Sequence, residues 1–346
     1  MHTERHWRRT LGAIMAILLA TPLHAQVSSA ESQSRIVLTP FATLPGRDAD
    51  SEPAQFGTIS RAVLRSAGSV VLADNQAHAL SLVDLKGTRV ASGSLSGDSR
   101  QGVVHVSAIA IDAKGDLLIY DERSGFLHSY QVRGSSIRLA HSAQLFSGGS
   151  DMCVMHQSAY VLLYHNGNVI HEFDLSGRHV RSFAPPDGEN DVARMGSLAG
   201  GAGILCDAAT GTVMLRVSAS PVLRAFNSDG TSRWRQVVPD FRSLKIEAMS
   251  DGSIEMSRPP GGVDVTMSAF ALAGGALAVQ IARNRPDTAQ HRKPPIETIV
   301  LRAKDGVQLA SSSRLEKLFE LGQHKVGFVE RSPRQVLRIW SVSMAP

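Results

Sequence analysis

A motif that recurs along the chain is the feature that most restricts its fold. Runs of alternating apolar residues end four times in a turn that closes on a glycine: Gly87, Gly134, Gly177 and Gly230. These glycines lie 43 to 53 residues apart, and a looser fifth copy ends at Gly306. A four-stranded propeller blade takes about 40 to 50 residues. The repeat therefore predicts a chain built from propeller blades.

Each copy contains the same order of short strands. In the second copy, residues 106–112, 117–120 and 126–131 are β-branched or aromatic runs, and Gly115 marks the first turn. The fourth copy repeats this order at 203–207, 213–217 and 222–226. Such runs between turn residues are strand signals, and no segment has a helical period long enough for a crossover helix. We therefore expect the strands to be antiparallel neighbours.

The two ends of the repeat region indicate how the fold closes. After Gly306 a shorter copy offers strands at 325–329 and 336–342, while Arg35–Thr39 is a strand without a copy of its own. Pairing this strand with the last copy would hide both exposed edges. We predict an all-β fold, a six-bladed β-propeller of four-stranded antiparallel blades over residues 35–346, closed by its N- and C-terminal strands. Five or seven blades remain alternatives.

One pair of segments carries a resemblance to a known superfamily. Val70–Asn75 (VVLADN), followed by Leu80–Gly87 (LSLVDLKG), resembles bacterial six-bladed β-propellers of the NHL-like and TolB-like kind, and the likeness covers the chain from about residue 35. The resemblance implies the fold but no single activity, because the superfamily includes protein-binding scaffolds, lactonases and other hydrolases. The chain departs from the pattern at one repeated position, where the first two copies have Asp74 and Asp121 and the third copy has His165. The lactonase set of Glu and Asn metal ligands is not evident, so lactonase activity is not inferred.

The first 25 residues have the three zones of a secretory signal peptide. A cationic stretch with Arg5, Arg8 and Arg9 precedes an apolar run from residue 11 to 20 and a polar exit that ends at Ala25. The apolar run is about half the length that crosses a bilayer. We expect cleavage after residue 25, a linker over 26–34, and a periplasmic or secreted protein with no stable membrane insertion. The paired arginines leave the choice between the general and the twin-arginine export route open.

Charge does not identify a partner. The chain has 36 Lys and Arg against 31 Asp and Glu, but no block of basic residues. Nucleic-acid binding is therefore not expected, because such proteins usually gather their basic residues on one surface. We expect a monomer that binds an unknown protein or small ligand.

Two stretches interrupt the repeat, and insertions in repeat proteins often lie on the binding face. Residues 242–267 contain an extra strand-like pair around Asp251. Residues 284–297 form a polar, proline-containing loop with a basic cluster, which is either a candidate binding loop or a surface loop with no partner. The cluster consists of Arg285, His291, Arg292 and Lys293.

Alignment of the copies brings a set of polar residues to the entrance of the central channel. They are Ser60, His105, Ser107, Asp151 and Asp264. His105 with the two carboxylates could bind a divalent cation or act in acid–base chemistry, whereas the simpler interpretation is a polar, water-lined channel. No HExxH, CxxC, GxSxG or EF-hand motif is present, so the sequence identifies no cofactor and no confident catalytic residue.

A glycine cluster and a cysteine pair have two interpretations each. Gly200, Gly201 and Gly203 could form a phosphate-binding loop, but a strand pattern follows them, which favours a tight inner strand. Cys153 and Cys206 fall in the first strands of adjacent copies, where an exported protein could form a disulfide. We expect two buried thiols instead, because inner strands of neighbouring blades usually diverge beyond the Cα spacing of about 4.4 to 6.8 Å that a disulfide tolerates.

These observations favour a non-enzymatic, exported β-propeller that binds its ligand across one face. The alternative is a metal-dependent hydrolase or lactonase-like enzyme with its site in the central channel.

Overall fold

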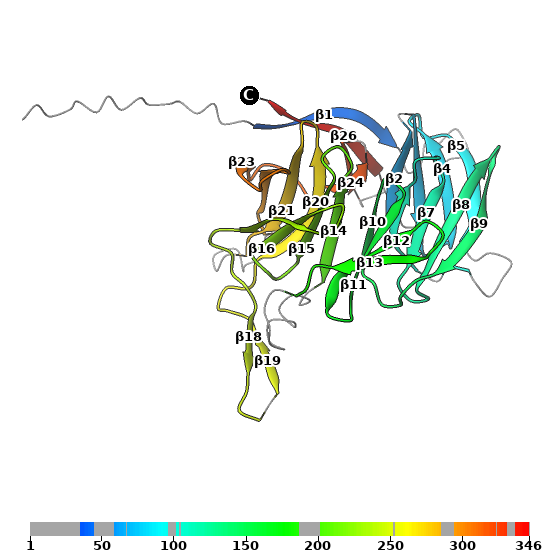
Figure 1. Ribbon diagram of the computed structural model, residues 1–346. Helices are drawn as coiled ribbons and strands as arrows, with labels where there is room; N and C mark the ends of the chain where they lie inside the picture. The colour runs from blue at the N-terminus through cyan, green and yellow to red at the C-terminus, as the bar shows by residue number, and fades with distance from the viewer. Residues whose placement is uncertain are drawn as a thin grey trace, which may run out of the picture. The chain divides into compact units, whose positions relative to one another are not determined.

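The computed structural model describes residues 35–44, 59–66, 68–95, 102–103, 105–186, 201–251, 253–284, 294–322, 324–330 and 336–345. Within these ranges the chain forms 26 strands joined by turns, and no helix (Figure 1). In the same ranges, no helix has the length and apolar character that would cross a membrane. The expected signal peptide and linker lie outside the described residues.

The largest sheet has eight strands and consists of two antiparallel halves. The first half is β2 (Arg61–Ser66), β3 (Ser69–Asp74), β4 (Ala79–Asp84) and β5 (Arg89–Ser94). The second half is β6 (Val106–Ile111), β7 (Leu117–Asp121), β8 (Phe126–Arg133) and β9 (Ser136–Gln144). A single parallel pair between Ser92 and Ser136 joins β5 to β9.

Three sheets of four consecutive antiparallel strands follow. The first contains β10 (Asp151–Met155), β11 (Ser158–His165), β12 (Asn168–Asp174) and β13 (His179–Phe183). The second contains β14 (Ala202–Asp207), β15 (Thr212–Val217), β16 (Val222–Asn227) and β17 (Ser232–Val237). The third contains β20 (Val265–Leu272), β21 (Ala276–Ala282), β22 (Ile296–Arg302) and β23 (Gln308–Ser312).

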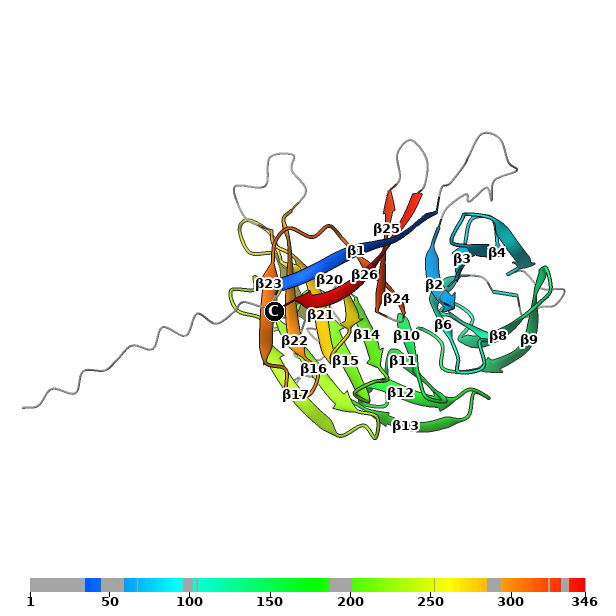
Figure 2. The same ribbon diagram turned by 90° about the horizontal axis from the view of Figure 1, so that it is seen from above.

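The last sheet joins the two ends of the described chain. It contains β24 (Phe319–Gly322), β25 (Lys325–Glu330), β26 (Val336–Ala345) and β1 (Arg35–Leu44). β1 pairs antiparallel with β26 from Arg35 opposite Ala345 to Leu44 opposite Leu337, and Figure 2 shows the two strands side by side. The predicted pairing of the terminal strands is therefore present. β24 was not predicted from the sequence, because it is only four residues long.

The first strands of the successive repeats form a closed cycle of neighbours. β2 contacts β6, β6 contacts β10, and the contacts continue through β14, β20 and β24 back to β2. Apolar side chains fill the spaces between neighbouring sheets. Leu72 and Val83, for example, pack in one buried cluster with Leu321 and Ile339 of the last sheet. The arrangement is β-propeller-like, with its core distributed between the sheets.

Two of the glycine turns of the sequence repeat share one geometry. The carboxylate of Asp84 accepts hydrogen bonds from the backbone N–H groups of Lys86 and Thr88, and Asp174 does the same for the turn ending at Gly177. The glycine adopts φ of 89° at Gly87 and 90° at Gly177, a conformation that side chains disfavour. In these two copies the aspartate and the glycine together fix the turn between the third and fourth strands.

The segment at 242–267 contains a separate hairpin. β18 (Lys245–Ala248) pairs with β19 (Ile254–Ser257) in a two-stranded sheet that joins no other strand (Figure 1). The strand-like pair seen in the sequence around Asp251 corresponds to this hairpin.

The two cysteines form a disulfide, contrary to the expectation of two free thiols. The Cα atoms of Cys153 on β10 and Cys206 on β14 are 5.6 Å apart, within the range that a disulfide needs. The expectation was wrong because β10 and β14 are in direct contact where these residues lie and have not yet diverged. Both cysteines border the central cavity described below.

Candidate functional site

The cycle of first strands encloses a cavity of about 1670 Å³. Every one of these strands contributes to its wall, mostly through small and apolar side chains such as Ala108, Ala110, Met152, Met267 and Ala269. Charged side chains interrupt this apolar wall at a few places. Those that interact with one another are Arg61, Asp151, Asp207, Arg216 and Glu320.

Asp151 begins β10 and holds two neighbouring strands together. Its Oδ1 accepts a hydrogen bond from its neighbour Met152 N (3.0 Å), and its Oδ2 accepts one from Ile204 N of β14 (3.1 Å). Burial raises the pKa of Asp151, while the positive charge of Arg216 and these hydrogen bonds oppose the rise. This carboxyl group is therefore enclosed by protein and anchored on one side, with part of its surface facing the cavity.

Arg216 projects from β15 across the inner strand of its own sheet. Its Nη1 donates to the backbone carbonyl of Thr266 at 3.1 Å. Gly203 lies opposite Arg216 in the β14–β15 register, and a Cβ at Gly203 would lie 2.3 Å from Nη2 of the guanidinium. Gly203 thus lies in a tight inner strand, as expected, and the space without a side chain holds the guanidinium. Gly201 precedes β14, and Gly200 lies outside the described residues.

Glu320 lies on β24 and faces the cavity. Burial raises the pKa of Glu320 to about 8, and the nearby charges of Asp207 and Asp151 add to this rise. A hydrogen bond with the backbone of Ala271 lowers it only in part. At neutral pH this side chain is therefore mainly the uncharged acid, and it loses its proton when a positive charge comes close.

Arg61 and Asp207 complete the charged group. The Nε of Arg61 donates to the carbonyl of Ser107 (2.8 Å), and its Nη1 donates to the carbonyl of Ser60 (3.0 Å). The Oδ1 of Asp207 accepts from Ala209 N (3.2 Å), and its Oδ2 accepts from the hydroxyl of Thr210 (2.6 Å). Both side chains thus stabilise local backbone as well as bordering the cavity.

Of the five residues predicted at the channel entrance, two border the cavity: Ser60 and Asp151. The other three do not line it. His105 Nδ1 lies 3.4 Å from a carboxylate oxygen of Glu122, and the hydroxyl of Ser107 accepts a hydrogen bond from Glu122 N. His105 and Ser107 thus come together with Glu122.

Asp264 belongs to a buried ion-pair network. Its Oδ2 lies 3.1 Å from Nη1 of Arg283, and its carboxylate accepts hydrogen bonds from the backbone N–H groups of Arg242 and Asn284. Arg283 also pairs with Glu297 at 2.6 Å. Asp264 makes its contacts with Arg242, Arg283 and Asn284 and not with His105 or Asp151. In the described part of the chain, no three His, Cys, Asp or Glu side chains are placed to bind a metal. The basic cluster Arg285, His291, Arg292 and Lys293 lies outside the described residues.

Arg61, Asp207, Arg216 and Glu320 were not predicted from the sequence. A signal was present for two of them, because Arg216 and Glu320 each interrupt an apolar run in a strand segment, VMLRV and LFELG. A charge inside a buried strand is expensive unless it has a partner or borders a cavity. The sequence showed the interruption, but only the closed cycle of strands shows that these positions face the same space.

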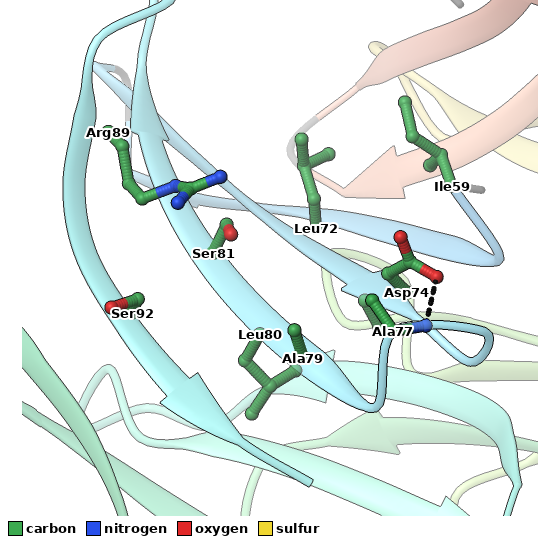
Figure 3. Close-up of a pocket in the computed structure, with 10 residues that line it drawn as sticks. Ile59, Leu72, Asp74, Ala77, Ala79, Leu80, Ser81, Arg89 and Ser92 are labelled. Carbon is green, nitrogen blue, oxygen red and sulfur yellow. Dashed lines mark hydrogen bonds between the residues drawn. The ribbon is translucent and has the colours of Figure 1, made fainter. Parts of the chain in front are cut away.

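A second, smaller cavity of about 180 Å³ lies against the sheet of β2 to β5 (Figure 3). Its carboxylate, Asp74, accepts a hydrogen bond from Ala77 N at 2.9 Å and from Gln76 N at the same distance. Asp74 therefore fixes the turn after β3. The small volume and the structural role of its carboxylate make this cavity a weaker candidate than the central one.

Comparisons with known proteins define the fold more than the function. No protein-family model matches the sequence, and no curated protein matches it significantly. Among solved structures, a member of the DUF4221 family from Bacteroides vulgatus has a TM-score of 0.56 at 9% identity, covering 90% of this chain and 99% of its own. A Bacteroides fragilis protein that carries the provisional description of an exported protein has a TM-score of 0.52 at 6% identity, covering 92% and 97%.

A more distant likeness is to the β-propeller domain of a Myceliophteria thermophila protein, with a TM-score of 0.44 at 8% identity, covering 88% of this chain and 99% of that domain. At these identities the two stronger likenesses show a shared fold. They assign no ligand or activity to this chain.

Proposed function

We propose that the chain is a six-bladed β-propeller that binds a small ligand in its central cavity. The blade count is supported by the cycle of six first strands and by the four-stranded antiparallel groups behind them. The pairing of β1 with β26 supplies the closure that such a ring needs. The NHL-like and TolB-like superfamily is the group that this architecture resembles.

The proposal includes export to the periplasm or the medium. The disulfide between Cys153 and Cys206 supports it, because disulfides persist in oxidising compartments and are rare in the cytosol. The signal-peptide pattern of the first 25 residues and the description of the Bacteroides fragilis neighbour agree with it.

The observation that carries the binding function is the charged cluster in the wall of the large cavity. Propeller blades surround a central channel, and interacting charges buried in the wall of that channel cost stability. Ligand sites instead combine an apolar wall with a few placed polar groups, as this cavity does. The predicted metal-dependent hydrolase set of His105, Asp151 and Asp264 has less support, since no contact links its members.

Thermal unfolding of residues 26–346 tests the proposed function. A ligand that binds only the folded protein raises its apparent stability by RT ln(1 + [L]/Kd). We expect a rise in the melting temperature with at least one small molecule from a panel of periplasmic metabolites, unchanged by a chelator. A shift that a chelator abolishes and one divalent cation restores would favour the hydrolase. No shift with any compound would contradict the small-ligand function.

A further inference from the structure

We propose that the ligand of the central cavity is a small organic cation, an alkylamine whose protonated nitrogen pairs with the carboxylate of Glu320, near the negative charges of Asp151 and Asp207. This inference rests on the proposed binding function and names the ligand class of that same cavity.

The charges of the interacting cluster leave room for a cation. The interacting group contains three carboxyl side chains and two guanidinium groups. Hydrogen bonds to backbone carbonyls already occupy Nε and Nη1 of Arg61 and Nη1 of Arg216. The positive groups therefore serve the protein's own strands. The cluster is balanced while Glu320 is protonated, and an additional positive charge would balance the negative charge that Glu320 gains when it ionises.

Glu320 is the member of the cluster that is most available to a ligand. Asp151 and Asp207 each accept two hydrogen bonds from nearby strand and turn groups. Among the described residues, no side chain donates a hydrogen bond to Glu320. This carboxyl group forms a hydrogen bond with the backbone of Ala271. An ammonium group, which carries several N–H donors and no acceptor, matches such a carboxylate.

The remainder of the wall fits the alkyl part of an amine. Ala108, Ala110, Met152, Met267 and Ala269 present methyl and thioether surface around the charged cluster. Burial of CH₂ groups on such a surface favours binding. A bare metal ion would leave this surface unused, and the described carboxyl groups do not form a three-ligand metal set.

The protonation of Glu320 is consistent with the same ligand, and it makes the affinity for that ligand depend on pH. Because burial raises the pKa of this side chain to about 8, an incoming ammonium group must displace a proton before the ion pair forms. Asp151 and Asp207 face it and favour its protonated form. The charged groups on strands packed against β24 are Arg61 and Arg65 on β2 and Lys325 and Glu330 on β25, whereas β20 carries none.

Isothermal titration calorimetry with 1,4-diaminobutane tests the inference. Its matched controls are 1,4-butanediol, which has no charge, succinate, which is an anion, and Ca²⁺. We expect the diamine to bind and the three controls not to bind. We also expect affinity to rise, with proton release, between pH 6 and pH 9. Binding of succinate, or of Ca²⁺ in place of the diamine, would overturn the cation assignment.

Glu320→Gln keeps the shape of the side chain but removes its charge, and it should fold because the native group is mainly uncharged near pH 7. We expect this variant to bind the diamine more weakly by about tenfold or more at pH 9 and with little change at pH 6. Glu255→Gln, on the β18–β19 hairpin, is the matched control and should bind like the wild type. Equal affinity of Glu320→Gln and wild type at pH 9 would overturn the role of this carboxylate.

The outcomes separate this inference from the proposed function. If another class of small molecule shifts the melting temperature and the diamine does not bind, the cavity binds a ligand but the cation assignment is wrong. If no compound of any charge binds, the proposed function itself is wrong.

Discussion

Gly203 and Arg216 face each other across β14 and β15, and the guanidinium of Arg216 occupies the space that a side chain at Gly203 would need. This relationship couples a glycine in an inner strand to the charged cluster of the central cavity. It explains why a strand that is otherwise apolar has a residue without a side chain at this position.

Gly203→Ala should displace the Arg216 side chain and weaken its contact with Thr266. We expect the free energy of unfolding to fall by about 1–3 kcal/mol, the usual cost of overpacking. The measurement is the urea midpoint. Gly68→Ala is the control, because no atom lies within 4 Å of the Cβ it would add. An equal loss in both variants would show that the effect comes from the backbone and not from Arg216.

The Cys153–Cys206 disulfide closes a loop with a sequence separation of 53 residues. Restricting the unfolded chain in this way typically stabilises a protein by about 2–4 kcal/mol. We therefore expect the double variant Cys153→Ser with Cys206→Ser to melt at a lower temperature than the oxidised wild type. Thiol titration of the denatured, unreduced protein should find no free thiol, and two free thiols would contradict the structure.

His171 makes the stability of the fold dependent on pH. It is buried on β12, its Nδ1 lies 2.7 Å from the hydroxyl of Ser182, and burial lowers its pKa from 6.5 to about 4. The neutral form is thus favoured in the folded state, so this stabilisation is complete above pH 6.5 and is lost as the pH falls toward 4.

Urea unfolding at pH 7.5 and pH 4.5 should show this effect. We expect His171→Gln to lose less stability than the wild type over this range, by about 1–2 kcal/mol after allowance for solvent screening. His141→Gln, at an exposed position on β9, is the control. A wild-type pH dependence that His171→Gln leaves unchanged would exclude His171 as its source.

The pairing of β1 with β26 should be required for a stable monomeric fold. Removal of residues 1–44 deletes β1 and exposes the edge of β26, which can then pair with another chain. We expect this truncation to melt at a lower temperature and to associate, as seen by size-exclusion chromatography with light scattering. Removal of residues 1–32 leaves β1 in place and should change neither property. An unchanged melting temperature after the longer deletion would contradict the closure.

The architecture could be predicted because its signals are local and repeated. A glycine in each turn, preceded in two copies by an aspartate such as Asp84 before Gly87, marks where the third strand ends, and alternating apolar residues mark the strands. The partnership of β1 with β26 followed from counting strands and from the need to protect edges. The fourth strand of each copy was expected but not located, and β24 was not predicted, because its four residues give little periodicity.

The candidate site could be predicted only in part, because its residues come together through the closure of the ring. Asp151 and Ser60 were found by aligning the copies, but the same alignment included Asp264, whose carboxylate is held by Arg283. Arg216 lies on a second strand and enters the cavity only because Gly203 leaves space for it. The spacing of residues along the chain does not reveal which side chains lie close together in space. The disulfide between Cys153 and Cys206 was not expected for the same reason.

The central claim is that the large cavity is the binding site, and blocking its wall tests this most directly. Ala209 is exposed and borders the cavity, so Ala209→Trp places an indole there without entering the core. Ala77→Trp, next to the small cavity of Figure 3, is the matched control. The measurement is the affinity, by calorimetry, of the compound that most raises the melting temperature. We expect Ala209→Trp to weaken binding at least about tenfold and Ala77→Trp to leave it unchanged. Equal binding by wild type and Ala209→Trp would contradict the account.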